Sequence, residues 1–151
     1  MQGSVSVQMA ASPDVVWNLV SDITRIGEFS PETFEAEWLR GATGPAVGAR
    51  FRGHVKRNGV GPIYWTTCRV DQCVPGEDFG FTVVVGDRDV NHWRYRLRPV
   101  EGGTEVTESF ALQTQAWSRV YWAILGKLRG RTNERGMRQT LERIKAIAEA
   151  A

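Results

Sequence analysis

The order in which strand-like and helix-like patterns follow one another most constrains the fold of this chain. One alternating stretch and two short helical stretches come first, six more alternating stretches follow, and residues 115–149 are mostly helical in pattern. Turn signals such as Asn58-Gly59 and Pro75-Gly76 join consecutive alternating stretches, and strands joined by short turns form an antiparallel meander. We therefore predict an α+β fold in which a seven-stranded, curved antiparallel sheet wraps around a long C-terminal helix.

The predicted strands span Ser4–Met9, Thr33–Arg40, Ala49–Arg57, Ile63–Val74, Asp78–Val85, Asn91–Arg98 and Thr104–Gln113. After the first strand, Ser12 is a candidate N-cap, and Pro13 and Asp14 suit the first turn of a helix. The apolar side of that helix is predicted to comprise Val15, Val16, Trp17, Leu19 and Val20. A second short helical turn is predicted from Asp22 to Glu28.

The C-terminal helical region contains two apolar stripes that do not share one face. The first stripe comprises Trp117, Tyr121, Ile124 and Leu128, and the second comprises Met137, Leu141, Ile144 and Ala148. Nine residues separate Leu128 from Met137, so at ~100° per residue the two stripes lie roughly opposite each other. Gly130 and Gly136 weaken the helix between them. We predict a break between Gly126 and Gly136, with the second half packed on the sheet.

Length and composition indicate one domain, residues 1–151, with 42% hydrophobic and 24% charged residues. Cys68 and Cys73 lie in one predicted strand, roughly 17 Å apart at a strand's rise, so they cannot form a disulfide with each other. Unpaired thiols suit a reducing compartment. There is no signal-peptide pattern and no long apolar run. A cytoplasmic location is expected.

Positive charge is concentrated near the C-terminus. Residues 114–151 contain eight Lys or Arg against three Asp or Glu, whereas residues 1–113 contain 11 against 14. Such a basic helix can meet a nucleic acid or a membrane, but a solvated helix face is the simpler interpretation, and no nucleic-acid partner is predicted. Residues 117–131 are interpreted as a lid over a cavity. A transient membrane-surface contact or a dimer patch remains an alternative, and the chain is expected to be a monomer or a dimer.

Several segments, in this order of elements, resemble the START/Bet v 1-like (SRPBCC) superfamily, and within it the bacterial polyketide cyclase/dehydrase-like branch. The segments that carry the resemblance are Ala11–Trp17, Phe29–Glu32, Gly44–Phe51, Pro75–Phe81, Trp93–Leu97, Gly103–Ser109 and Thr140–Lys145. Together they cover essentially the whole chain. The resemblance implies a helix-grip fold with a cavity between sheet and helix that holds a hydrophobic small molecule. Members of the superfamily range from cyclases and aromatases to lipid carriers.

One acidic residue shares its strand face with apolar residues. Alternation directs Val106, Phe110 and Leu112 inward, and Glu108 falls in the same register. A carboxylate inside an apolar barrel must be paired, protonated or hydrated, and burial raises its pKa unless a cation lies nearby. Glu108 is therefore the leading candidate for a polar ligand contact or for a general acid/base, together with Tyr95. Alternatively, Glu108 lies at the barrel mouth or hydrogen-bonds a neighbour, namely Tyr95, Tyr64 or Thr66.

Other kinds of site have little support in the sequence. His54 and His92 fall on the predicted outer face, no spacing resembles a zinc site, and Ser109 has no histidine in its register. The glycines at positions 41, 44 and 48 connect two strands and open no helix, so they do not form a phosphate-binding loop. No metal and no cofactor is predicted.

The predicted function is binding or carriage of a hydrophobic small molecule, such as a lipid or a polyketide-like compound. The predicted ligand-binding residues are Trp38, Phe51, Phe81, Val83, Trp93, Tyr95, Glu108, Phe110 and Tyr121. One alternative is a cyclase/aromatase or dehydratase in which Glu108 and Tyr95 move protons. Another alternative is an interaction protein whose interior is filled by side chains.

Overall fold

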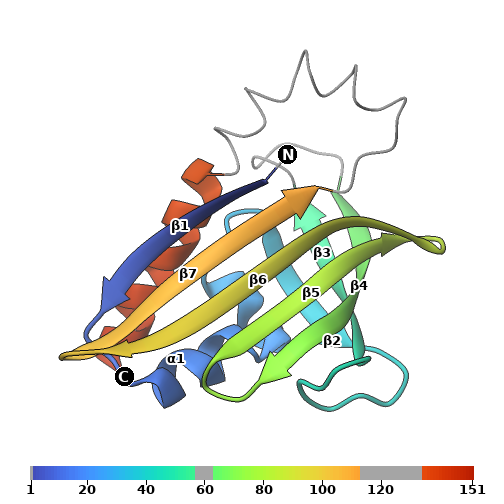
Figure 1. Cartoon of the computed structure of the whole chain (residues 1–151). Coiled ribbons are helices and arrows are strands. Elements are labelled where there is room, and N and C mark those ends of the chain that lie inside the picture. The colour runs from blue at the N-terminus through green and yellow to red at the C-terminus, as the bar shows by residue number, and fades with distance from the viewer. Residues whose placement is uncertain (1, 57–62, 113–133) are drawn as a thin grey trace.

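The computed structural model describes residues 2–56, 63–112 and 134–151. Its seven strands form one antiparallel sheet in the order β1-β7-β6-β5-β4-β3-β2, which curves around the helices (Figure 1). The strands are β1 (Gln2–Met9), β2 (Thr33–Trp38), β3 (Arg50–Lys56), β4 (Ile63–Val74), β5 (Asp78–Val85), β6 (Arg88–Val100) and β7 (Gly103–Leu112). The predicted α+β helix-grip architecture is confirmed.

Most strand limits differ slightly from those predicted. β4 and β5 have the predicted bounds, whereas β6 starts three residues earlier and ends two residues later than expected. β2 ends at Trp38 rather than at position 40 because Arg40 takes a φ of 52° and Gly41 a φ of 78°. This left-handed backbone is incompatible with an extended strand.

Two short helices follow β1, as predicted. In α1 (Pro13–Val20), the Ser12 hydroxyl accepts a hydrogen bond from the backbone N–H of Val15 at 3.4 Å. Val15 itself is 37% exposed, so its assignment to the apolar side was wrong. The second helix, η1 (Ile23–Glu28), is a 3₁₀-helix capped by Asp22.

The C-terminal helix, residues 134–150, lies against the sheet (Figure 1) and packs on it through the second predicted stripe. Met137, Leu141, Ile144 and Ala148 are all buried in the core, which confirms that stripe. The helix follows β1: Met137 lies near Gly3, and the Glu149 carboxylate accepts a hydrogen bond from the backbone N–H of Ala10 at 2.7 Å. The first stripe and most of the predicted break lie outside the described residues.

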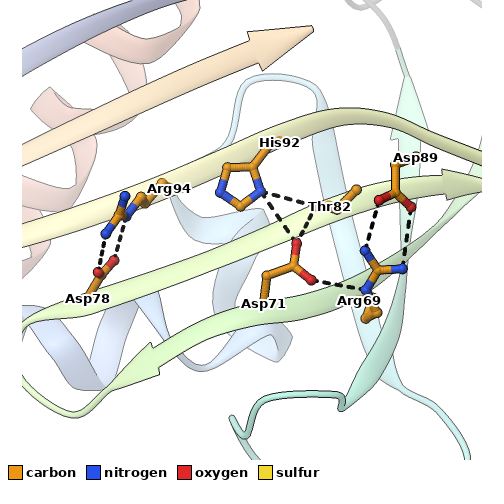
Figure 2. A network of polar contacts seen from close by, with 7 residues as sticks. All are labelled: Arg69, Asp71, Asp78, Thr82, Asp89, His92 and Arg94. Atoms are coloured by element: carbon orange, nitrogen blue, oxygen red, sulfur yellow. Dashed lines mark hydrogen bonds and ion pairs between the residues drawn. The ribbon is translucent and has the colours of Figure 1, made fainter. Parts of the chain in front are cut away.

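The outer face of the sheet carries a polar network (Figure 2). A register shift in β4 between Val70 and Gln72 marks a bulge at Asp71. Asp71 accepts hydrogen bonds from Arg69 and Thr82, and the Thr82 hydroxyl lies 3.0 Å from His92 Nδ1. The network therefore covers the middle of the sheet, which explains why Thr82 is only 3% exposed although it faces outward.

Ion pairs extend this polar surface. Arg69 also contacts Asp89 at 3.1 Å, and Arg94 pairs with Asp78 (Figure 2). Arg98 pairs with Glu105 on the neighbouring strand at 3.1 Å. Among the described residues, no helix is long and apolar enough to span a membrane.

Candidate functional site

The concave side of the sheet is filled at one end and hollow at the other. At the filled end, Val16 and Leu19 of α1 and Leu141 and Ile144 of the C-terminal helix pack against Val106 and other sheet residues. At the hollow end a pocket of about 400 Å³ remains. The C-terminal helix contributes only its first turns to this pocket, through Gly136, Met137 and Thr140.

The pocket wall is mainly apolar. Its apolar side chains come from five strands and include Phe51, Val55, Phe81, Val83, Trp93, Phe110 and Leu112. Such a volume and lining are typical of small-molecule sites, which occupy roughly 300–1,000 Å³. Two of the lining residues, Tyr64 and Val85, are themselves 39% and 65% exposed.

Aromatic contacts hold much of this wall in place. The Phe51 and Phe81 rings meet edge to face with centroids 5.1 Å apart, and Trp93 and Phe110 lie 4.8 Å apart on β6 and β7. Each such pair contributes ~0.5–1.5 kcal/mol beyond its buried area. These contacts favour the observed positions of the four rings whether or not a ligand is bound.

Glu108 lies in this apolar environment and is only 3% exposed. It stands opposite Tyr95 in the β6–β7 ladder, and the Tyr95 hydroxyl donates a hydrogen bond to its carboxyl group. Burial raises the pKa of Glu108 to about 8, and the Tyr95 hydrogen bond opposes that rise. Burial also raises the pKa of Tyr95. Both groups are therefore mostly neutral at pH 7.

The Glu108–Tyr95 pair leaves one atom available for other chemistry. Oε1 of Glu108 is buried and has no hydrogen-bond partner within the described part of the chain. A neutral carboxyl group can donate a hydrogen bond or a proton, and its ionised form can accept one. A carboxyl group with a pKa of about 8 can serve either role near neutral pH.

The structure brings seven of the nine predicted ligand-binding residues to the pocket wall: Phe51, Phe81, Val83, Trp93, Tyr95, Glu108 and Phe110. Trp38 does not line the pocket. Instead it packs edge-on against Phe51, with centroids 5.8 Å apart, at the opposite end of β2 from Thr33, which does line the pocket. Tyr121 lies outside the described residues.

Sequence analysis missed Asn91 as a wall residue. It lines the pocket, and its buried side-chain oxygen Oδ1 has no hydrogen-bond partner within the described ranges. The signal was present, because Asn91 shares its strand face with Trp93 and Tyr95. Thr66 and Thr140 also line the pocket, but their hydroxyl groups donate to the carbonyl groups of Gly53 and Gly136.

Neither histidine takes part in this site. His92 joins the outer network, and His54 stacks on Trp65 at 4.1 Å and hydrogen-bonds Glu35. In the described part of the chain, no group of three or more His, Cys, Asp or Glu side chains is arranged to hold a metal ion. Cys68 lines the pocket, and burial raises the pKa of its thiol to about 12, so it is a poor nucleophile.

A family model described as polyketide cyclase/dehydrase and lipid transport matches residues 2–149. The chain belongs to this family. This assignment agrees with the resemblance seen in the sequence and with the helix-grip fold. No curated protein matches the chain.

Several solved structures share the fold of this chain. A polyketide-cyclase-like protein from Corynebacterium glutamicum, Cgl2372, is 31% identical, with 98% of this chain and 85% of that chain covered and a TM-score of 0.53. Protein CV1439 from Chromobacterium violaceum is 18% identical over 99% and 98% of the two chains, with a TM-score of 0.69. The di-domain ARO/CYC protein StfQ of the steffimycin biosynthetic pathway has a TM-score of 0.76 at 14% identity. The match covers 99% of the present chain and 50% of StfQ.

Proposed function

We propose that this protein binds or carries a hydrophobic small molecule, lipid-like or polyketide-like, in the pocket between the sheet and the C-terminal helix. The observation that carries the proposal is the pocket of about 400 Å³, with its aromatic wall and a buried carboxyl group, one oxygen of which has no hydrogen-bond partner among the described residues. Burial of apolar ligand surface would provide most of the affinity, at ~25 cal/mol per Å² before entropic costs. The same pocket weighs against an interior filled by side chains.

The first test is native mass spectrometry of gently purified protein, followed by denaturing extraction of any compound that accompanies it. Near-stoichiometric retention of a hydrophobic compound would support the proposal and identify the chemical class. If the protein is free of small molecules, we expect it to bind the neutral apolar dye N-phenyl-1-naphthylamine in the pocket. If no compound accompanies the protein and the dye does not bind either, the proposal is refuted.

A second function is favoured by one specific observation, the Glu108 carboxyl group with its pKa of about 8 beside Tyr95. A family member with this pair could act as a cyclase/aromatase or dehydratase, with Glu108 transferring a proton to or from a bound polyketide-like substrate. The Glu108→Gln variant separates the two functions. A carrier keeps most of its affinity for the extracted compound, whereas an acid/base enzyme keeps binding that compound but loses its conversion.

A further inference from the structure

The described pocket wall contains two buried side-chain oxygens without a hydrogen-bond partner, Glu108 Oε1 and Asn91 Oδ1. Buried polar atoms are nearly always satisfied in folded proteins, so an orphan atom that faces a pocket points to a ligand group that satisfies it. Each of the two atoms therefore indicates one hydrogen-bonding group of the ligand, and the charges of the wall limit the ligand further.

The two atoms lie at different depths in the pocket, because their residues occupy different positions along β6 and β7; we call these positions the deep level and the outer level. In the β6–β7 ladder Glu108 stands opposite Tyr95 and Asn91 opposite Leu112, four residues farther along each strand. At strand rise this separates the two levels by roughly 13 Å. Glu108 is 3% exposed and lies deep, whereas the Asn91 level lies toward exposed Val85. A ligand that meets both must be elongated.

The deep level calls for a hydrogen-bond acceptor. Tyr95 already donates to the Glu108 carboxyl group, so in the neutral carboxyl group the unpartnered Oε1 can carry the proton and act as a donor. A carbonyl oxygen is the natural partner for such a donor.

The outer level calls for a donor, because a side-chain amide oxygen only accepts hydrogen bonds. A register shift between β5 and β6 leaves Val90 as an extra residue beside Asn91. Such β-bulges re-aim side chains and are common next to binding and catalytic sites. A hydroxyl group on the ligand would satisfy Asn91 Oδ1.

The charges of the described part of the wall disfavour anionic ligands. None of the described residues that line the pocket is Lys, Arg or His, whereas Glu32 and Glu108 are both acidic. The other titratable side chains of this wall are Tyr64, Cys68 and Tyr95. A fatty-acid carboxylate or a phosphate headgroup would enter this part of the pocket without a cation to pair with, which is costly.

We propose that the pocket selects a neutral, elongated, mostly apolar molecule with a carbonyl oxygen at its deep end, bound by Glu108, and a hydroxyl group bound by Asn91. This inference rests on the proposed ligand-binding function and names its ligand class. It separates hydroxylated ketones from fatty acids and phospholipids, which the same apolar wall would otherwise accept.

The test uses displacement of N-phenyl-1-naphthylamine from the full chain by tridecane, tridecan-2-one, tridecanoate and 12-hydroxydodecan-2-one. At pH 6.5 the ketone should bind about tenfold more tightly than the alkane, the gain from roughly one hydrogen bond. It should also bind more tightly than tridecanoate. At pH 9.5 the preference for ketone over alkane should disappear, because ionised Glu108 can no longer donate.

Three variants show which residue causes each preference. Glu108→Gln should keep the preference for the ketone at both pH values, because the glutamine amide donates regardless of pH. Asn91→Leu should remove the roughly tenfold advantage of the hydroxyketone over tridecan-2-one and leave the ketone preference intact. Glu105→Gln is the matched control, since Glu105 lies on the same strand but pairs with Arg98 outside the pocket.

Two results would overturn the inference. If the wild-type protein binds the dye and all four probes without a ketone preference at pH 6.5, or binds tridecanoate most tightly, the pocket is apolar but does not select this ligand class. If neither the dye nor any probe binds, the proposed ligand-binding function fails as well. The pH comparison on the wild-type protein needs no variant, so a poorly folding substitution does not block the test.

Discussion

Replacing Glu108 by glutamine should remove a pH dependence of folding that the wild-type protein carries. The pKa of Glu108 is about 8 in the folded protein and 4.5 as an ordinary carboxyl group. Between these values the folded state holds a proton that the unfolded state has released. The contribution of Glu108 to stability is therefore greatest below pH 4.5, falls as the pH rises toward 8, and is constant above that.

The size of the effect follows from the pKa difference. Each pH unit within this window costs ~1.36 kcal/mol, so the wild-type protein should lose about 4 kcal/mol of unfolding free energy between pH 5 and pH 9 on account of Glu108 alone. This is a large part of a typical stability of ~5–15 kcal/mol. Glutamine has nearly the same shape and no charge to bury, so Glu108→Gln should lack this loss.

Urea unfolding followed by tryptophan fluorescence at pH 5, 6, 7, 8 and 9 measures the effect. The difference between wild type and variant isolates Glu108, because burial raises the pKa of its neighbour Tyr95 above the ordinary value of 10 and Tyr95 therefore does not ionise between pH 5 and pH 9. Glu105→Gln, which removes a half-buried carboxylate from the outer face of the same strand, should change stability by only ~0–1 kcal/mol across this range. A wild-type-to-variant difference that stays constant from pH 5 to pH 9 would refute the burial of an uncompensated carboxyl group.

Three further outcomes are expected. Ile144→Ala should lower the unfolding free energy by ~2–5 kcal/mol in urea titration, because this side chain is fully buried between helix and sheet; a loss below ~1 kcal/mol would contradict that packing. Gly103→Ala should lower the melting temperature by several degrees, since its Cβ would meet the carbonyl oxygen that ends β1, whereas Gly44→Ala, with open space around it, should not. Iodoacetamide at pH 8, followed by peptide mass mapping, should label half-buried Cys73 faster than buried Cys68, whose thiol has a pKa of about 12; equal rates would contradict this order.

The buried carboxyl group of Glu108 and the buried amide group of Asn91 illustrate what strand alternation can predict. The register of β7 already directed Glu108 toward the interior, because Val106 and Phe110 fix which face is buried. The same reasoning applied to Trp93 and Tyr95 would have included Asn91. Neither prediction required three-dimensional information, because side chains alternate with a period of two along any strand.

Other features depend on how the strands pair. Thr82 faces outward by alternation, yet it is buried because a bulge in β4 brings Asp71 over it and His92 approaches from β6. Trp38 is an aromatic residue of the kind that lines such pockets, but it lies at the far end of β2 from Thr33 and packs against Phe51 instead. Bulges and strand order arise from contacts between segments that are distant in the chain, and a single alternating pattern does not contain them.

The sequence by itself determined the element order, the antiparallel meander, the buried stripe of the C-terminal helix and the inward direction of Glu108, because each depends on local periodicity and turn chemistry. Only the tertiary structure decided that the concave sheet is filled at one end and hollow at the other. It also placed Tyr95 opposite Glu108 with no cation in the described wall of the pocket. The volume of a pocket and the pKa of a buried group each depend on the positions of many neighbouring residues at once. The fold brings those neighbours together from distant parts of the chain.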